Sequence, residues 1–162
     1  MNETYKVQVQ DLVDDLKAVF THAGLGGEAG EYKLLTQSFL YKFLNDKFLY
    51  QAQVLDAGNT YENLLTMSEE DYDWLLEDIG TSTAWLKPDQ LIETLHRQQN
   101  EATFYETFEN TLNQIAIDNN DIFSVHTDGD TAIRLFDERL ITDNISDSSK
   151  RNEVAKAIIN LL

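Results

Sequence analysis

The spacing of apolar residues predicts a mainly helical protein organised around residues 31–50. In this stretch apolar side chains recur at helical intervals and also fill much of the remaining circumference. The apolar positions are Tyr32, Leu34, Leu35, Phe39, Leu40, Tyr41, Phe43, Leu44 and Phe48. Because a helix that is apolar nearly all round must be buried, we expect other helices to surround it as the centre of a compact multi-helix domain.

Amphipathic patterns predict further helices on both sides of this central helix. The apolar stripes lie at residues 9–20, 91–95, 102–117 and 152–162. Residues 118–145 hold apolar residues in short pieces, which leaves room for a minor strand pair. Residues 146–149 form a polar break before the last helix.

Several residues are typical of helix ends. Thr60 and Ser68 are suitable N-caps for two short helices, and Gly80 is a suitable end for the second one. Pro88 fits the first turn of the helix that carries the stripe at 91–95. These signals place short helices between the central helix and the later ones.

Two features of the middle of the chain allow both a structural and a binding interpretation. The polar face of the helix that follows Ser68 is acidic and has no basic residue. Its acidic positions are Glu69, Glu70, Asp73, Glu77 and Asp78. We interpret this face as solvated, with a partner-binding surface as the alternative. Similarly, we interpret Trp85 as a core residue, with a base-stacking platform as the alternative.

Composition sets broad limits on the class of protein. The chain has 162 residues, 42% of them hydrophobic, which suits one domain with a real core. It has no cysteine, so disulfides, thiolate nucleophiles and Cys-based zinc sites are excluded. The polar start predicts no signal peptide, and the lack of a long apolar run predicts no membrane span. We therefore expect a cytoplasmic protein without a membrane partner.

Part of the central helix resembles a known family. The spacing of its aromatic and lysine residues is similar to the opening signature of the modification (methyltransferase) subunit of type I restriction-modification systems. Six segments occur in the same order as in the N-terminal domain of that family. They are Leu34-Leu35, Ser38 to Leu44, Asn45 to Phe48, Trp85 to Pro88, Asp121 to Phe123 and Val154 to Leu162. The resemblance covers essentially the whole chain.

The resemblance implies a single helical N-terminal domain over residues 1–162, with a methyltransferase domain following it in a longer protein. The parent protein would methylate adenine in DNA with S-adenosylmethionine. Its partners would be DNA, a specificity subunit, a second modification subunit and a restriction subunit. This domain would help the complex embrace DNA and assemble. No Gly, Lys, Arg or Pro closes the last helix, which also leads us to expect a truncated chain.

The chain lacks the motifs of the parent activity. The family's catalytic loop has the form Asn/Asp-Pro-Pro-aromatic, whereas Pro88 is the only proline here. The glycine-rich run at 24–30 follows a helix instead of a strand, so we interpret it as a helix cap and connector. His22, His96 and His126 form no metal motif. We therefore predict no catalytic, cofactor-binding or metal-binding residue, and assign S-adenosylmethionine to the parent protein only.

Acidic clusters occur at residues 118–121 and 128–130. Neither has the twelve-residue alternation, closed by a glutamate, that an EF-hand needs to bind calcium. We interpret both as turns.

The net charge of −17, from 12 Lys and Arg against 29 Asp and Glu, opposes DNA binding. Any DNA-facing surface must therefore be a local basic patch, or DNA affinity must come mostly from other parts of a larger assembly. The DNA-contact candidates are Lys150 and Arg151, which extend the polar break to residue 151, and Lys42 and Lys47 on the central helix. We favour the break, because a flexible basic loop can reach a phosphate. Other basic residues gather at His96-Arg97, Arg134 with Arg139, and Lys156.

Two other functions fit the composition. A free-standing acidic protein could mimic DNA and occupy the groove of a DNA-binding protein. A helical protein-interaction adaptor without a nucleic-acid role is the third possibility. Continuation of the native gene beyond Leu162 into a Pro-Pro-aromatic loop would exclude the mimic.

Overall fold

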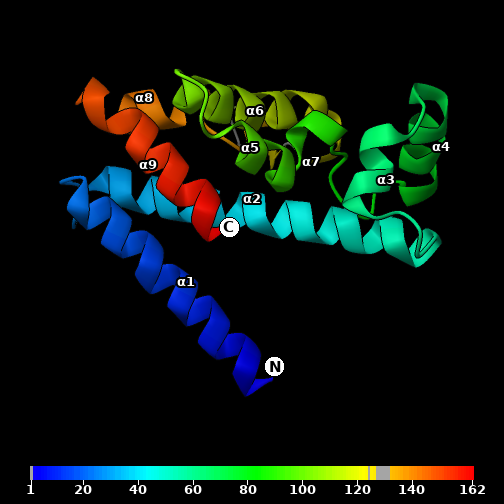
Figure 1. Ribbon diagram of the computed structural model, residues 1–162, viewed down its shortest axis with the longest axis horizontal. Coiled ribbons are helices and arrows are strands. Elements are labelled where there is room, and N and C mark those ends of the chain that lie inside the picture. The colour runs from blue at the N-terminus through cyan, green and yellow to red at the C-terminus, as the bar shows by residue number, and fades with distance from the viewer. Residues whose placement is uncertain (1, 124, 127–131) are drawn as a thin grey trace.

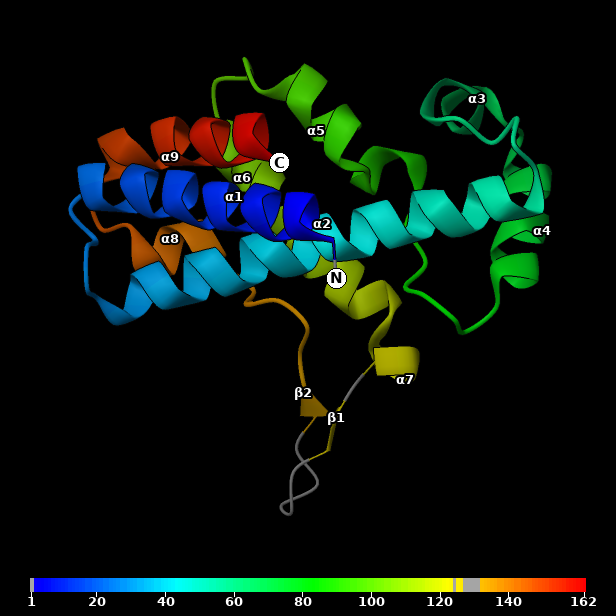
Figure 2. The same ribbon diagram turned by 90° about the horizontal axis from the view of Figure 1, so that it is seen from below.

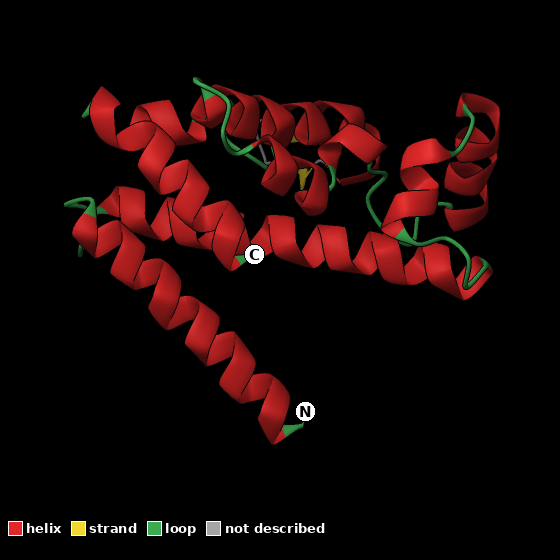
Figure 3. Cartoon of the chain, viewed as in Figure 1, coloured by secondary structure: helices red, strands yellow, loops and turns green. Residues whose placement is uncertain are grey.

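The fold is mainly helical, as predicted, and its helices pack together along one long helix (Figures 1 and 3). The computed structural model describes residues 2–123, 125–126 and 132–162. The helices are α1 (Glu3–His22), α2 (Ala29–Leu55), α3 (Tyr61–Thr66), α4 (Glu69–Ile79), the 3-10 helix η1 (Pro88–Gln90), α5 (Ile92–Gln98), α6 (Phe104–Asp118), α7 (Asn120–Phe123), α8 (Leu140–Asn144) and α9 (Ser148–Leu161). The strands β1 (Val125–His126) and β2 (Ala132–Ile133) pair antiparallel on one side of the helices (Figure 2).

The 27-residue helix α2 is the predicted central element, and α1, α4 and α8 pack against it. Its buried side consists of Leu34, Ser38, Tyr41, Leu44, Asn45, Phe48 and Ala52. The expectation that α2 is buried all round is wrong, because Tyr32, Phe43 and Tyr50 are exposed, with Phe43 at 58%. Apolar composition favours burial, but only the sides of α2 that other helices contact are covered.

Tyr41 lies at the centre of the core. Its ring meets those of Phe108 and Phe136 edge to face, with centroids 6.3 and 6.4 Å away. Its hydroxyl donates a 2.7 Å hydrogen bond to the Gln90 carbonyl. Burial, and secondarily the charge of Asp89, raises the pKa of Tyr41 well above its ordinary value. The phenol therefore stays protonated and fixes α2 to η1.

A second polar side chain of α2 reinforces this junction. Asn45 is buried, and its Oδ1 accepts a 2.9 Å hydrogen bond from the backbone N–H of Ile92. Since Ile92 begins α5, this bond satisfies one of the N–H groups that a helix start leaves without a partner. Pro88 begins η1 instead of the following helix, which corrects the predicted boundary.

Helix α1 diverges from one end of α2 (Figure 1). Its predicted stripe contributes Leu16 and Phe20 to the core, whereas Tyr5 and Val7 are exposed. Only the second half of α1 is therefore anchored by buried side chains, and α9 and α2 are the helices that it contacts.

The opposite end of α2 carries α3 and α4 (Figure 1). As predicted, Thr60 and Ser68 cap these helices by accepting a hydrogen bond from the backbone N–H three residues later. Gly80 ends α4 with a φ of 65°. The Tyr72 ring stacks on that of Phe48, with centroids 6.4 Å apart. We call residues 48–86, which hold the end of α2, α3 and α4, the distal lobe.

Trp85 joins the distal lobe to α6. Its backbone N–H donates to Asn119 Oδ1 at 2.7 Å, and its carbonyl accepts from Asn119 Nδ2 at 2.9 Å. The indole Nε1 donates to the Gly80 carbonyl at 2.7 Å. Trp85 packs against the core while remaining half-buried, which agrees with the structural interpretation of this residue.

Candidate functional site

Lys150 and Arg151 lie in the first turn of α9, which corrects the predicted flexible break. Asp147 caps this helix, because its Oδ1 accepts hydrogen bonds from the Ser149 N–H at 3.0 Å and the Ser149 hydroxyl at 2.6 Å. These two bonds lower the pKa of Asp147. The sequence Ser-Ser-Lys-Arg is polar because this turn lies at the surface, although it is helical.

Lys150 and Arg151 do not form a joint patch. Arg151 Nε donates a 2.9 Å hydrogen bond to the Ile145 carbonyl, and its guanidinium carbon lies 5.8 Å from the Tyr105 ring centroid. Lys150 lines a different hollow, between α1 and α9, together with Val19. Consecutive helical residues point about 100° apart, so the pair is divided between two surfaces.

The two candidates on α2 already have local partners. Lys42 Nζ lies 3.0 Å from Asp46 Oδ2, one helical turn away. Lys47 Nζ lies 5.7 Å from the Phe43 ring centroid. Each lysine is thus engaged at the surface of α2 itself, and such surface ion pairs contribute little to stability.

The structure instead brings two arginines from separate segments together. Arg139 and Arg151 line one hollow of about 360 Å³, which we call the arginine hollow. Its other lining residues are Tyr105, Glu106, Glu109, Asn110, Asn113, Glu138 and Thr142. They come from α6, α8, α9 and the residues before α8, so no single stretch of sequence indicates the grouping. Arg134 lies next to it and donates to Asn113.

The negative charge at the base of the arginine hollow is already engaged. Glu109 is 5% exposed, and its carboxylate accepts from the N–H groups of Ile141 and Thr142 at 3.0 and 2.9 Å. The Thr142 hydroxyl donates a third bond of 2.7 Å. Glu109 thereby satisfies the first N–H groups of α8 and complements its dipole. With Arg139 and Arg151 beside Glu106, Glu109 and Glu138, the arrangement suits binding of a polar group.

Other predicted sites take structural roles. The glycine run joins α1 to α2, and the Gly27 N–H donates a 2.6 Å hydrogen bond to the Glu31 carboxylate. Over residues 2–123, 125–126 and 132–162, no group of three or more His, Asp or Glu side chains could hold a metal ion. The acidic cluster at 128–130 lies outside the described residues. Among the described helices, none is both long and apolar enough to cross a membrane.

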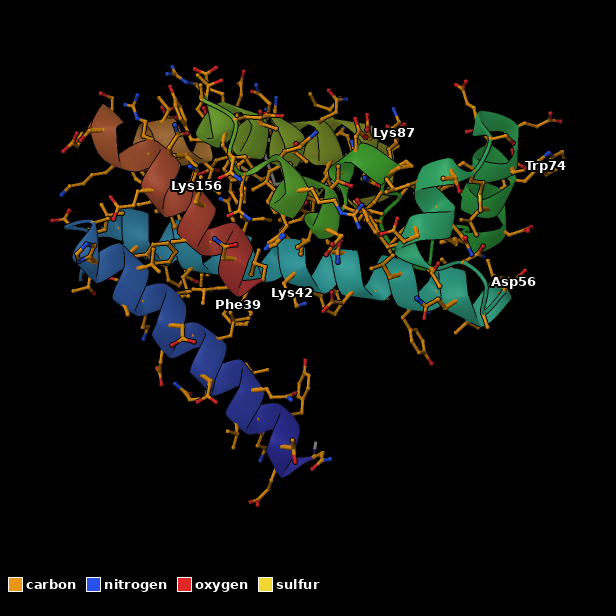
Figure 4. The ribbon with its side chains drawn as sticks, viewed as in Figure 1. Phe39, Lys42, Asp56, Trp74, Lys87 and Lys156 are labelled. Carbon is orange, nitrogen blue, oxygen red and sulfur yellow. The ribbon has the colours of Figure 1, made fainter. Side chains whose placement is uncertain are left out.

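The sequence interpretation missed Trp74 on the outer face of α4. This side chain is 60% exposed and points away from the rest of the molecule (Figure 4). It lines a shallow hollow of about 540 Å³ together with Glu69, Glu70, Asp73 and Glu77. The sequence did contain a signal for the position of Trp74. This residue follows Glu70 by four residues, which places it on the acidic face of the helix.

Comparisons with known proteins add no family assignment. No protein-family model, curated protein or solved structure matches this chain. The arginine hollow and the α4 face are therefore interpreted from their own geometry and chemistry.

Proposed function

We propose that the chain is the helical N-terminal domain of the modification subunit of a type I restriction-modification system and acts by binding alone. It would help the complex embrace DNA and assemble with the specificity subunit, the second modification subunit and the restriction subunit. Adenine methylation with S-adenosylmethionine would belong to the rest of the parent protein.

The observation that carries the proposal is that two regions similar to the family, residues 38–48 and 85–88, are linked in the core through Tyr72 and the adjoining Gln90. Tyr41 belongs to the first of these segments and bonds to the carbonyl of Gln90 in η1, which begins at Pro88. The Leu86 carbonyl accepts from the Tyr72 hydroxyl, and the Tyr72 ring stacks on Phe48. Residues that resemble the family are thus residues that hold the fold together, which supports a shared architecture.

The charge distribution supports a local DNA contact. Arginine together with uncharged donors binds phosphate well, and the arginine hollow offers Arg139 and Arg151 beside Asn110 and Asn113, although Glu106 and Glu138 also line it. Lys42 is engaged with Asp46 and is a weaker candidate. With a net charge of −17, the domain would add only a few phosphate contacts to those of the complete complex.

The DNA contact is tested by a salt titration of the 162-residue chain with a fluorescein-labelled DNA duplex. Changing Arg139 and Arg151 to Gln should weaken binding and reduce the slope of log K against log salt by about 0.9 for each phosphate that the variant no longer neutralises. The matched control changes Lys42 and Lys47 to Gln, which alters the net charge equally and should leave the slope unchanged. Equal effects of both variants would contradict the assignment of the hollow.

The assembly role is tested by co-purification of the chain with the specificity subunit of the same system. A stable complex is the expected result. If the chain bound neither DNA at low salt nor the specificity subunit, the proposed function would be wrong. Competition with DNA for a DNA-binding protein would then favour the acidic mimic.

A further inference from the structure

The outer face of α4 combines an exposed tryptophan with carboxylates on one side of a helix. We call Glu69, Glu70, Asp73, Trp74 and Glu77 the Trp74 face, since these five residues line one hollow. They recur at intervals of three and four residues and so share one helical face. The opposite face of α4 buries Tyr72, Leu75, Leu76 and Ile79. The Trp74 face is therefore a helix face without a partner in the described part of the chain.

The distal lobe itself supplies no cation to this face. The distal lobe contains eight Asp and Glu residues and no Lys, Arg or His, so it holds −8 of the net −17. Arg97 of α5 reaches the lobe, but it pairs with Glu62 of α3. Among the ion pairs between described residues, none involves a carboxylate of the Trp74 face. These carboxylates are thus open to a basic partner.

Helix stability accounts for only two of the four charges on the Trp74 face. Glu69 and Glu70 lie in the first turn, where they complement the helix dipole. Asp73 repels Glu69 and Glu77, because each lies four residues away along the helix. Glu77 also lies in the last turn, where a negative charge opposes the dipole. An exposed tryptophan adds a further cost, because its apolar ring stays in contact with water.

We propose that the Trp74 face docks an arginine-rich segment of a partner protein. A guanidinium stacks on an indole ring and also makes bidentate hydrogen bonds with carboxylates, so one arginine-rich segment satisfies both components of the face. Tryptophan is also the residue type most enriched among interface residues that dominate binding energy. The inference is independent of the type I assignment, because it rests only on the residues of the distal lobe.

Other occupants fit less well. Nucleic acid and anionic lipid carry the same sign of charge as the face and are repelled. A metal ion is not favoured, because the described residues contain no group of three acidic side chains arranged around one point. A second copy of the chain would also carry a net charge of −17 and would repel the first.

The experiment measures binding of a fluorescein-labelled peptide of eight arginines to the 162-residue chain at about 0.15 M salt. Two variants remove the surface, Trp74→Ala and the pair Asp73→Lys with Glu77→Lys. The control pair Asp14→Lys with Asp15→Lys makes the same change of net charge on α1, far from the distal lobe in sequence. Trp85 remains in every variant, and its fluorescence reports that the distal lobe is folded.

We expect each Trp74-face variant to weaken binding about tenfold and the control to weaken it less than about twofold. A peptide of eight lysines should bind several-fold more weakly than a peptide of eight arginines. The lysine ammonium has no planar face to lay on the indole ring, and it cannot make two parallel hydrogen bonds to one carboxylate. Equal weakening by the control would show general attraction to a polycation and overturn the proposal. Absence of binding, or an unchanged affinity of Trp74→Ala, would overturn it too.

Discussion

The surfaces near the two ends of α2 differ in their chemistry. Near the start of α2, the arginine hollow mixes arginines with carboxylates, and Glu109 is fully engaged by the start of α8. At the other end, the distal lobe has no basic residue and exposes Trp74. Aromatic pairs nevertheless pack in the core both at the middle of α2, between Tyr41 and Phe108, and in the distal lobe, between Phe48 and Tyr72. The surface chemistry of a helical domain can therefore differ sharply between regions that one helix joins.

The net charge is distributed unevenly between the distal lobe and the rest of the chain. The value of −17 suggests a uniformly acidic molecule, but all 12 Lys and Arg residues lie outside the distal lobe. The rest of the chain therefore has 21 acidic and 12 basic residues, and it can form local patches that attract anions. The two ends of the molecule therefore differ in the charge of the partner that each would favour.

The largest expected effect tests whether the two ends unfold as one unit. Phe108→Ala removes a buried ring beside Tyr41, outside the distal lobe, and should cost about 3–5 kcal/mol of unfolding free energy. Both tryptophans lie in the distal lobe, so tryptophan fluorescence reports on that lobe while circular dichroism reports on all helices. Because α2 is shared, the two urea transitions should coincide in the variant. Separate transitions would mean that the ends are independent units.

The next largest effect on stability comes from a mutation in the arginine hollow. Glu109→Ala leaves two N–H groups and the Thr142 hydroxyl without their acceptor, which should destabilise the fold by about 1–3 kcal/mol. The exposed neighbour Glu106→Ala should change stability by less than about 0.5 kcal/mol. Urea unfolding measures both values. Similar losses in the two variants would show that the buried cap has no special role.

Unfolding at different pH values compares the core around Tyr41 with the core around Tyr72 in the distal lobe. Burial raises the pKa of both Tyr41 and Tyr72, so the unfolded chain loses these protons near pH 10 while the folded chain keeps them. Their contribution is complete below pH 10, and stability should fall above it by about 1.4 kcal/mol per pH unit for each tyrosine. Tyr41→Phe and Tyr72→Phe should each reduce the slope of unfolding free energy against pH by about 1.4 kcal/mol per pH unit. Unchanged slopes would mean that neither phenol is kept neutral by the fold.

The smallest effect concerns the surface of the distal lobe. Glu77→Lys places a cation in the last turn of α4 and should stabilise the fold by about 0.3–1 kcal/mol while weakening binding of the arginine peptide. Asp14→Lys, in the middle of α1, should change neither property appreciably. Thermal unfolding and the peptide titration give the two readouts. A stability loss in Glu77→Lys would show that the acidic face stabilises α4.

Local signals in the sequence were sufficient for much of the fold. The caps Thr60 and Ser68 and the end at Gly80 were predicted, because each acts through a backbone hydrogen bond or a φ value within a few residues. The start of α9 was missed, because Asp147 was not recognised as a cap and a polar first turn resembles a loop. Burial around α2 was overestimated, because it depends on which distant helices pack there.

The candidate surfaces were harder to predict than the helices. Lys150 and Arg151 are adjacent in sequence and divided in space, whereas Arg139 and Arg151 are separated in sequence and share a hollow. Only the tertiary packing of α6, α8 and α9 produces that grouping. The acidic face of α4 was visible in the sequence, but its interpretation depended on the exposure of Trp74.

The continuity of α2 also fixes the reach that a two-ended partner needs. At 1.5 Å per residue, its 27 residues extend over about 40 Å. A flexible tether that spans the full length of α2 would need at least about 12 fully extended residues. The length of this helix therefore sets the scale of the shortest tether with which one partner could engage both of its ends at once.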